Sequence, residues 1–233
     1  MPLYNPASFR RSDLEDLSDF IHAHPLGLLI THGTDGLDAS SIPFRLYRDE
    51  GDHGVLRAHV ARANPQWKVC AAGGECLVVF QGAQGYVTPS WYASKAEHHR
   101  VVPTWNYTMV QCRGTPQVVH EAAWLHRQIA DLTDVHEGGR TARRPWAVSD
   151  APPDFIDAQV QAIVGIELPI RWIEGKFKLS QNRPAPDQVG VVEGMSNPDD
   201  PHHNPEVAAL VRAARDRPRP VADGPGGAPV TPP

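Results

Sequence analysis

The sequence predicts a mainly β (α+β) fold, in which antiparallel strands form a barrel and a few helices lie at its periphery. Strand-like stretches follow one another closely, and only three or four segments have helical spacing of their apolar residues. A parallel, doubly wound sheet would need a helix after nearly every strand, which this pattern does not provide. We therefore expect one closed antiparallel sheet with strands at 26–31, 39–47, 54–59, 76–81, 104–112 and 165–173.

The N-terminal region has signals for one helix and one β hairpin. Residues 12–15, Ser-Asp-Leu-Glu, form a capping box, and the apolar residues after it recur at helical spacing up to Pro25. Residues 26–31 are an apolar run typical of a buried strand. Asp35-Gly36 is a hairpin turn that leads into the strand at 39–47.

Three further helices are expected before the last strand. Asn64-Pro65 opens one of them, with Asn64 as the cap and Pro65 at the first helical position. Apolar spacing predicts a second helix near 121–136 and a third at about 153–163. The inward side of the second helix is expected to carry Trp124, Leu125, Ile129 and Leu132.

The composition changes near residue 196. Nine of the 23 prolines lie between Pro198 and Pro233. Few large apolar residues remain there to form a core. We expect a cofactor-binding barrel domain over 1–195 and a mostly disordered tail over 196–233, with a short helix near 205–215.

The composition places the chain among ordinary globular proteins. It has 233 residues, of which 41% are hydrophobic and 21% charged. A formal net charge of −5 and only four lysines argue against direct binding to nucleic acid. No basic second helix of a helix-turn-helix is present.

The cysteines and the N-terminus predict a cytoplasmic protein. Cys70, Cys76 and Cys112 form no CxxC pair and are expected to be reduced and buried. The chain begins without a signal-peptide pattern, and no apolar stretch approaches the length of a membrane span.

The densest group of candidate site residues lies between His59 and Lys68. A strand ends near His59, and a helix begins with Arg62, Lys68 and free backbone N–H groups close together. Such a helix end can bind a phosphate or a carboxylate. The same residues also fit an ordinary capped helix with two solvated cations and a histidine satisfied within the fold.

A second candidate region, 86–107, is rich in aromatic residues. Aromatic rings mixed with hydroxyls and an amide can wall a planar ligand and hydrogen-bond its edge. They also fit as core and interface anchors. Because few charges lie among them, we expect this loop to form part of a twofold dimer interface.

A third candidate region, 176–184, places four polar or basic side chains directly after a barrel strand. A solvated basic loop is the alternative interpretation. The sequence has no GxGxxG after a strand, no P-loop, no HExxH and no nucleophile elbow.

Together these regions resemble the PaiB-like family, usually described as FMN-binding negative transcriptional regulators. The similarity covers roughly 2–195, and its motifs are HxARANPQWK at 59–68, PSWY at 89–92, VPTWNY at 102–107 and KLSQNRP at 178–184. The resemblance implies a split β-barrel related to pyridoxamine-phosphate oxidases. It also implies a homodimer with two cofactor sites across the subunit interface.

The same family includes heme-dependent enzymes similar to piperazate synthase. These enzymes close N5-hydroxyornithine into a six-membered ring through an N–N bond, with loss of water. In that branch, the resemblance makes His59 the axial ligand of the heme iron, with Arg62 and Lys68 facing the propionates. In a flavin site the same cations would face the FMN phosphate, so they do not decide between heme b and FMN.

Three positions depart from the pattern of regulator-like members. Those members tend to carry a histidine where this chain has Ser41, PHAY where it has Ala-Gln-Gly-Tyr at 83–86, and a histidine where it has Gln111. The changes indicate a retuned pocket, or drift in a loosely constrained family.

The candidate residues follow from these motifs. The expected catalytic residues are His59, Arg62, Ser41 and Tyr86, and His59 is the expected iron ligand. The expected cofactor-binding residues are His59, Arg62, Asn64, Gln66, Trp67, Lys68, Ser90, Trp91, Thr104, Trp105, Lys178, Ser180, Gln181, Asn182 and Arg183.

These expectations favour a heme b-dependent biosynthetic enzyme that acts on a small amino acid and forms an N–N bond. An FMN-binding negative transcriptional regulator and a flavin-dependent oxidoreductase are the alternatives.

Overall fold

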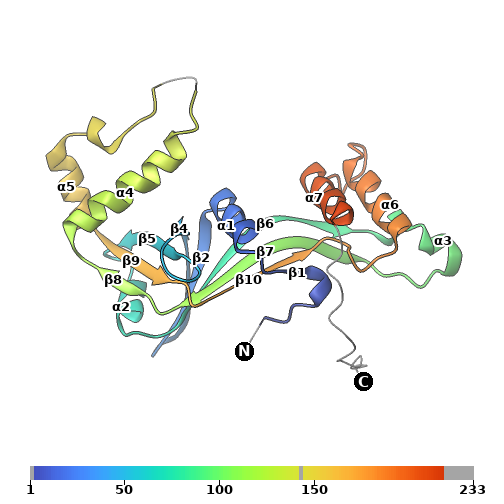
Figure 1. Ribbon diagram of the computed structural model, residues 1–233, viewed down its shortest axis with the longest axis horizontal. Helices are drawn as coiled ribbons and strands as arrows, with labels where there is room; N and C mark the ends of the chain where they lie inside the picture. Colours follow the sequence, from blue (N-terminus) through green and yellow to red (C-terminus); the bar gives the residue numbers. More distant parts are fainter. Residues whose placement is uncertain (1–2, 142–143, 218–233) are drawn as a thin grey trace. The chain divides into compact units, whose positions relative to one another are not determined.

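The computed structural model describes residues 3–141 and 144–217 (Figure 1). The chain divides into two compact units, Met1–Gln84 with Tyr107–Lys178, and Gly85–Asn106 with Leu179–Pro233. The division differs from the domain boundary at 195 that the sequence predicts, because residues 179–195 group with 85–106. In the described part of the chain, no helix is long and apolar enough to cross a membrane.

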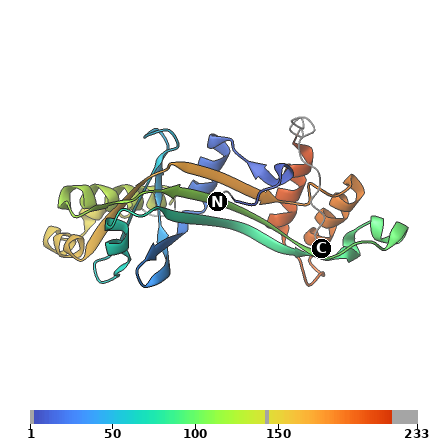
Figure 2. The same cartoon turned by 90° about the horizontal axis from the view of Figure 1, so that it is seen from below.

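Two sheets form the framework of the first unit. The strand pairs whose residue register is defined are antiparallel. The strand order of the six-stranded sheet is β1 (Arg10–Arg11), β10 (Trp172–Lys178), β7 (Thr104–Gly114), β6 (Cys76–Val87), β2 (Leu26–Gly33) and β3 (Gly36–Pro43). The strand order of the four-stranded sheet is β4 (Arg45–Tyr47), β5 (Val55–Ala61), β9 (Ile163–Pro169) and β8 (Gln117–Val119). Figure 2 shows β6 and β7 as long neighbouring strands that continue into the second unit.

The predicted class, antiparallel strands with peripheral helices, is confirmed, but the prediction of one closed sheet is wrong. The expected strand at 39–47 is two strands, because the chain leaves the larger sheet at Pro43 and enters the smaller one at Arg45. The expected strand at 165–173 is likewise divided between β9 and β10. Buried Phe44 marks the first of these changes of sheet.

The core of the first unit consists of apolar side chains from both sheets and from the segments that join them. Leu29, Phe44, Leu56, Phe80 and Ile166 are fully or almost fully buried members of this cluster. A methyl group on Gly27 would lie only 2.7–2.9 Å from Phe80, Val78 and Phe44. Glycine at this position of β2 therefore leaves room for Phe80 and Val78 of the neighbouring strand β6 and for Phe44.

Four helices of the first unit lie where the sequence predicts them, and two caps differ by one residue from the predicted ones. The helices are α1 (Leu14–Ala23), α2 (Gln66–Ala71), α4 (Ala122–Glu137) and α5 (Pro153–Gln161). The cap of α1 is Asp13, whose Oδ1 accepts hydrogen bonds from the backbone N–H groups of Glu15 and Asp16 at 3.1 and 3.0 Å. The cap is therefore Asp13, one residue after Ser12, which the predicted capping box places at the cap.

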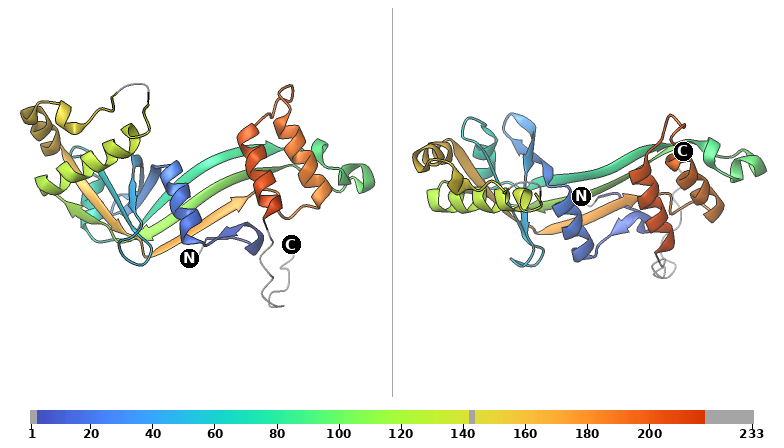
Figure 3. Two further views of the ribbon diagram at one scale, coloured as in Figure 1. Left: turned by 45° about the horizontal axis from the view of Figure 1, so that its top comes forward. Right: turned by 90° about the horizontal axis from the view of Figure 1, so that it is seen from above.

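Up to residue 217, the second unit contains three α-helices, α3 (Ser94–His98), α6 (Ala185–Ser196) and α7 (Pro205–Asp216). The last two pack side by side (Figure 3). Val207, Ala208 and Val211 of α7 are buried, and the Asn204 side chain caps this helix by accepting from the backbone N–H of Val207 at 3.1 Å. The stretch expected to be a mostly disordered tail thus begins with a packed helix near the predicted 205–215. The rest of that expected tail, 218–233, lies outside the described residues.

Replacing Gly27 by alanine should lower the free energy of unfolding by about 1–3 kcal/mol, because the added methyl group overpacks the contact with Phe80, Val78 and Phe44. Gly74→Ala is the matched control, since a methyl group there meets nothing within 4 Å. Urea denaturation of both variants measures the difference. A Gly27→Ala protein as stable as wild type would contradict the tight packing of these three side chains around Gly27.

Candidate functional site

His59 lies on β5, on the side of this strand that faces away from the main core. Leu56, Ala58 and Val60 point into the core, whereas Arg57 and His59 alternate with them and are half-buried. Helix α4 covers this outer side. The His59 Nδ1 atom lies 2.7 Å from Oε1 of Gln128, a residue of α4 that is only 2% exposed.

A glycine makes room for the helix beside His59. Gly165 of β9 is directly opposite His59 in the ladder. A methyl group on Gly165 would collide with the ring of Trp124, so only glycine lets α4 approach this closely. The Trp124 Nε1–H group donates to Glu167 at 3.4 Å.

Charged and aromatic groups continue from His59 along the same side of the small sheet. The Arg57 guanidinium donates to Glu167 at 2.6 Å and, through two nitrogens, to Glu50 at 2.9 and 2.6 Å. It also lies over the Tyr47 ring, 4.3 Å from the centroid. Tyr47 donates its O–H to Asp131 of α4 at 2.5 Å. Burial, followed by the bond to Asp131, raises the pKa of Tyr47 to about 12.

These groups surround a pocket of about 200 Å³ between α4 and the small sheet. A pocket of this size holds a small molecule or part of one and is too small for a whole heme or flavin. Its lining residues are Tyr47, Arg57, Trp124, Arg127, Gln128 and Asp131.

Arg62 does not direct its donors away from the protein, as an anion site would need. Its Nε and Nη2 atoms donate to the backbone carbonyls of Gln161 and Ile163, both at 2.8 Å, and Nη1 lies 3.4 Å from His120. The carbonyl of Arg62 in turn accepts from the indole of Trp67 at 3.0 Å. Arg62 therefore clamps the chain before β9 to the end of β5.

The other polar residues near the start of α2 also bond within the fold. The Asn64 side chain accepts from the backbone N–H of Gln66 at 2.9 Å, but the cap position of α2 is Pro65, one residue after the predicted cap. Buried Gln66 donates to the Leu29 carbonyl at 3.1 Å and to the Thr31 hydroxyl at 3.2 Å. Exposed Lys68 stays near Trp67, with its ammonium 5.7 Å from the ring centroid.

Ser41 lies on another strand. It is an exposed residue of β3, paired with Leu28, whereas His59 belongs to the smaller sheet.

In the second unit, two of the expected aromatic residues contact a histidine, His202. Tyr86 packs edge-on against Trp105, at 6.0 Å between ring centroids, and its ring is tilted against that of His202 at 4.7 Å. The Trp91 indole donates to Asp200 at 3.1 Å, and its ring lies 6.3 Å from His202. The side chain of His202 is exposed.

Ser90 and Thr104 lie in the same unit. Exposed Ser90 is 3.4 Å from the ammonium of Lys95, and its backbone N–H donates to the Thr88 hydroxyl at 3.2 Å. Thr104, at the start of β7, is half-buried.

The residues of the third region mainly shape a turn. Ser180 has a φ of 65°, is buried, and exchanges hydrogen bonds with Asn106 at 3.0 and 3.3 Å. The Gln181 side chain accepts from the backbone N–H of Leu179 at 2.7 Å, and the Arg183 guanidinium lies 4.4 Å from the Tyr92 ring centroid. Lys178 ends β10 as a half-buried residue of the first unit, and Asn182 is exposed.

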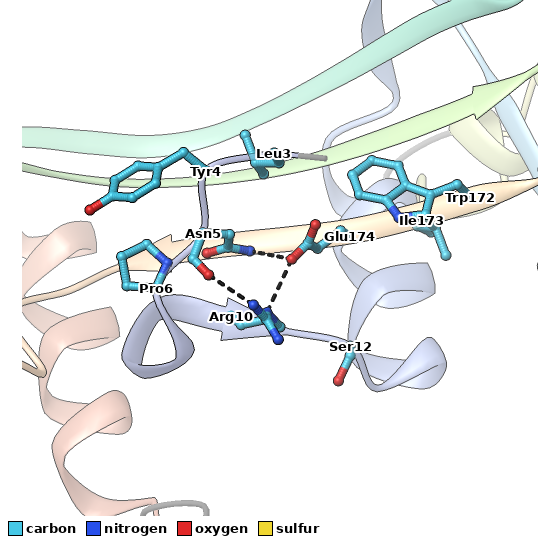
Figure 4. Close-up of a pocket in the computed structure, with 9 residues that line it drawn as sticks. All are labelled: Leu3, Tyr4, Asn5, Pro6, Arg10, Ser12, Trp172, Ile173 and Glu174. Atoms are coloured by element: carbon cyan, nitrogen blue, oxygen red, sulfur yellow. Dashed lines mark hydrogen bonds and ion pairs between the residues drawn. The ribbon is translucent and has the colours of Figure 1, made fainter. Parts of the chain in front are cut away.

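A larger pocket, of about 710 Å³, lies elsewhere in the first unit and is lined by none of the predicted site residues. Figure 4 shows its polar wall, where Asn5 donates to Glu174 at 2.9 Å and Arg10 pairs with Glu174 at 3.2 Å. Arg10 also donates to the Asn5 carbonyl at 3.1 Å. Because these groups bond to one another, they hold the N-terminal segment against β10.

Sequence reasoning missed Gln128, Tyr47 and Asp131. The signal for Gln128 was present, because it stands four residues after Trp124 and three after Leu125, on the side of the helix expected to face inward. A polar residue on that side needs a buried partner.

Residues 3–172 match the model of a protein family described as "Putative FMN-binding domain". The chain belongs to this family. Among its relatives, protease synthase and sporulation protein PAI 2 of Bacillus subtilis is 28% identical over 200 residues, which cover 86% of this chain and 92% of that protein. An uncharacterized protein of Aspergillus fumigatus is 33% identical over 236 residues, covering 83% and 90%. The predicted PaiB-like relationship is confirmed.

Two solved structures share the fold of this chain. The FAD and heme binding protein from Mycobacterium smegmatis has a TM-score of 0.52 and 20% identity, over 72% of this chain and 73% of that one. Flavocytochrome Anf3 from Azotobacter vinelandii has a TM-score of 0.52 and 16% identity, over 72% and 69%. At these identities the likeness establishes the split-barrel fold of this family member, which confirms the predicted class.

Replacing Tyr47 by phenylalanine should remove a pH-dependent part of the stability. Tyrosine in an unfolded chain ionises near about pH 10. Because the folded protein raises the Tyr47 pKa to about 12, the neutral phenol stabilises the fold fully below pH 10, and this stabilisation is lost as the pH rises to 12. The difference in unfolding free energy between wild type and Tyr47→Phe should therefore shrink across this range. A difference that stays constant from pH 9 to 12 would contradict the bond to Asp131.

Proposed function

We propose that this family member binds heme b through His59 and closes N5-hydroxyornithine into a ring by forming an N–N bond. The observation that supports heme is the orientation of His59. Its imidazole is half-buried, and its Nδ1 atom lies 2.7 Å from Oε1 of Gln128. Heme iron needs one such oriented imidazole nitrogen. Two donor nitrogens of Arg62 bond to backbone carbonyls, and this limits Arg62 as a contact for a heme propionate and for a flavin phosphate alike.

The fit of His59 to iron follows from its ring atoms. A neutral imidazole is a strong ligand for heme iron. The Nδ1 atom of His59 lies beside Oε1 of Gln128, whereas its Nε2 atom has no polar contact within the described part of the chain. Lys68, an exposed cation on α2, is our candidate contact for a propionate.

A bound heme would supply an iron centre that coordinates the hydroxylamine and assists cleavage of its N–O bond. In the balanced reaction, the N–N bond forms between the α-amine nitrogen and N5 while the N5–O bond breaks. The hydroxyl group leaves as water with a proton from the α-amine, so substrate and products have the same overall oxidation level. The part of the protein is to fold the flexible substrate for attack and to exclude water. Within the first unit, the exposed Ser41 hydroxyl is a candidate contact for the substrate.

FMN binding is the second candidate, either in a PaiB-like negative regulator or in a flavin-dependent oxidoreductase. The match of residues 3–172 to an FMN-binding family and the similarity to the Bacillus subtilis protein favour it. In that case Lys68 would face the phosphate, and His59 would contribute packing or a hydrogen bond.

The absorption spectrum of the purified protein distinguishes the two cofactors. We expect a sharp band near about 400 nm from heme, whereas a flavin would give bands near about 370 and 450 nm. His59→Ala should abolish the heme band and leave the barrel folded, because loss of a half-buried side chain costs only about 1–3 kcal/mol.

His126→Ala is the matched control. His126 is also half-buried, but it pairs with Asp157 at 3.0 Å, away from His59. Its replacement should leave the heme band unchanged. Full heme occupancy in His59→Ala would reject the ligand assignment, and a wild-type protein with flavin in place of heme would reject the enzyme proposal.

We further propose a twofold dimer with exposed apolar residues of the 86–107 region at its interface. Val102 is 66% exposed and Trp105 48% exposed, and aromatic residues are enriched at interface centres. Trp105→Asp should convert the dimer to a monomer in light scattering at micromolar concentration. Trp146→Asp, at a tryptophan that is 45% exposed, is the control and should remain dimeric. A monomeric wild-type protein would overturn the proposal.

A further inference from the structure

The contact between Gln128 and His59 fixes where the imidazole carries its proton. Oε1 of Gln128 lies 2.7 Å from Nδ1 of His59. An amide oxygen can only accept a hydrogen bond, so Nδ1 must carry the proton and donate it. In a neutral ring the other nitrogen, Nε2, then holds the free lone pair.

We propose that Gln128 is a positioning residue that holds His59 as its Nδ1–H tautomer and thereby keeps Nε2 available as the ligand atom. The proposal rests on the proposed heme function for the identity of the metal. Histidines that bind metals usually donate their second N–H to a protein acceptor, which fixes the tautomer and the ring orientation. Here the acceptor comes from α4, 69 residues away in the sequence.

Gln128 suits this role because its own surroundings hold it firmly. The residue is 2% exposed, and its neighbour Leu125 is buried against Ile156 and Val160 of α5. Trp124, one turn earlier, is held by Glu167. The helix therefore holds the Gln128 side chain beside β5.

The other end of the amide supports the same conclusion. The Nε2 atom of Gln128 is buried and has no hydrogen-bond partner in the part of the chain that the structure describes. Burying a polar atom without a partner is unfavourable, so an apolar residue would suit this place better if packing were the only requirement. The bond to His59 is the polar contact that Gln128 makes there, which explains a glutamine at this position.

The test compares Gln128→Leu, Gln128→Glu and Asp134→Leu. Leucine fills similar space without an acceptor, glutamate restores an acceptor, and Asp134 is an exposed residue of α4 outside the pocket lining that serves as a control. Nitrogen NMR of the histidine rings in the cofactor-free full chain, with His59→Ala to assign the signal, reports the tautomer. We expect Nδ1–H in wild type, Gln128→Glu and Asp134→Leu, and a substantial population of Nε2–H in Gln128→Leu.

Binding of hemin gives a second readout. Loss of such a hydrogen-bond partner typically weakens metal binding about 10–100-fold, and we expect a loss in this range for Gln128→Leu. Gln128→Glu should restore affinity, and its charge-assisted bond should make the imidazole a stronger donor and lower the iron reduction potential. A change in packing alone would not produce this shift. Melting curves show whether each variant remains folded.

The outcomes separate this inference from the proposed function. Nε2–H in wild type, or an unchanged tautomer and an unchanged hemin affinity in Gln128→Leu, overturns the role of Gln128 while His59 can remain the ligand. If wild type binds no hemin, the proposed function fails and the role toward iron fails with it. The NMR result then decides separately whether Gln128 controls the His59 tautomer.

Discussion

The structure of the first unit depends on backbone hydrogen bonds at the two places where the chain passes from one sheet to the other. At the first, the Phe44 N–H donates to the Pro25 carbonyl at 2.8 Å, at the start of β2. At the second, the N–H groups of Ile170 and Arg171 donate to Gly54 at 3.0 Å and to Arg113 at 2.8 Å, one toward each sheet. Because buried backbone groups must find partners, these bonds let the strands part without leaving polar groups unsatisfied.

The separation of the sheets creates the environment of His59. It leaves β5 and β9 in a small sheet whose outer side is covered by α4 rather than by another layer of strands. Polar contacts dominate this junction, with Arg57 held by Glu50 and Glu167 and with Tyr47 held by Asp131. Half-buried ion pairs contribute little net stability, since desolvation offsets much of their attraction. The apolar contact of Leu125 with Ile156 and Val160 must therefore supply most of the attachment of α4 to its surroundings.

Local sequence signals predicted the positions of the helices and strands better than they predicted which strands pair with each other. The helices expected near 121–136 and 153–163 lie within one or two residues of α4 and α5, because apolar spacing and prolines act over one or two turns. The sheet change at Phe44 was missed, since nothing in the alternation of 39–47 specifies which strand each residue will pair with. Helix α6 was missed because its two glycines disfavour a helix, although Gly190 and Gly194 allow close packing against Trp91.

In the candidate site, too, the local sequence identifies the residues but not the distant partners that decide what each residue does. The sequence identifies His59 and Arg62 together, but their roles differ because their partners come from distant segments. The guanidinium of Arg62 bonds to carbonyls near residue 162, whereas the imidazole of His59 bonds to Gln128 through one of its two nitrogens. A phosphate site at α2 would have to rely on Lys68 and the N–H groups of a helix of six residues. The imidazole of His59 is oriented by β5 and α4 together. The distant partners therefore give the two residues different roles within the first unit: Arg62 joins backbone segments, and His59 is held by α4 through one ring nitrogen.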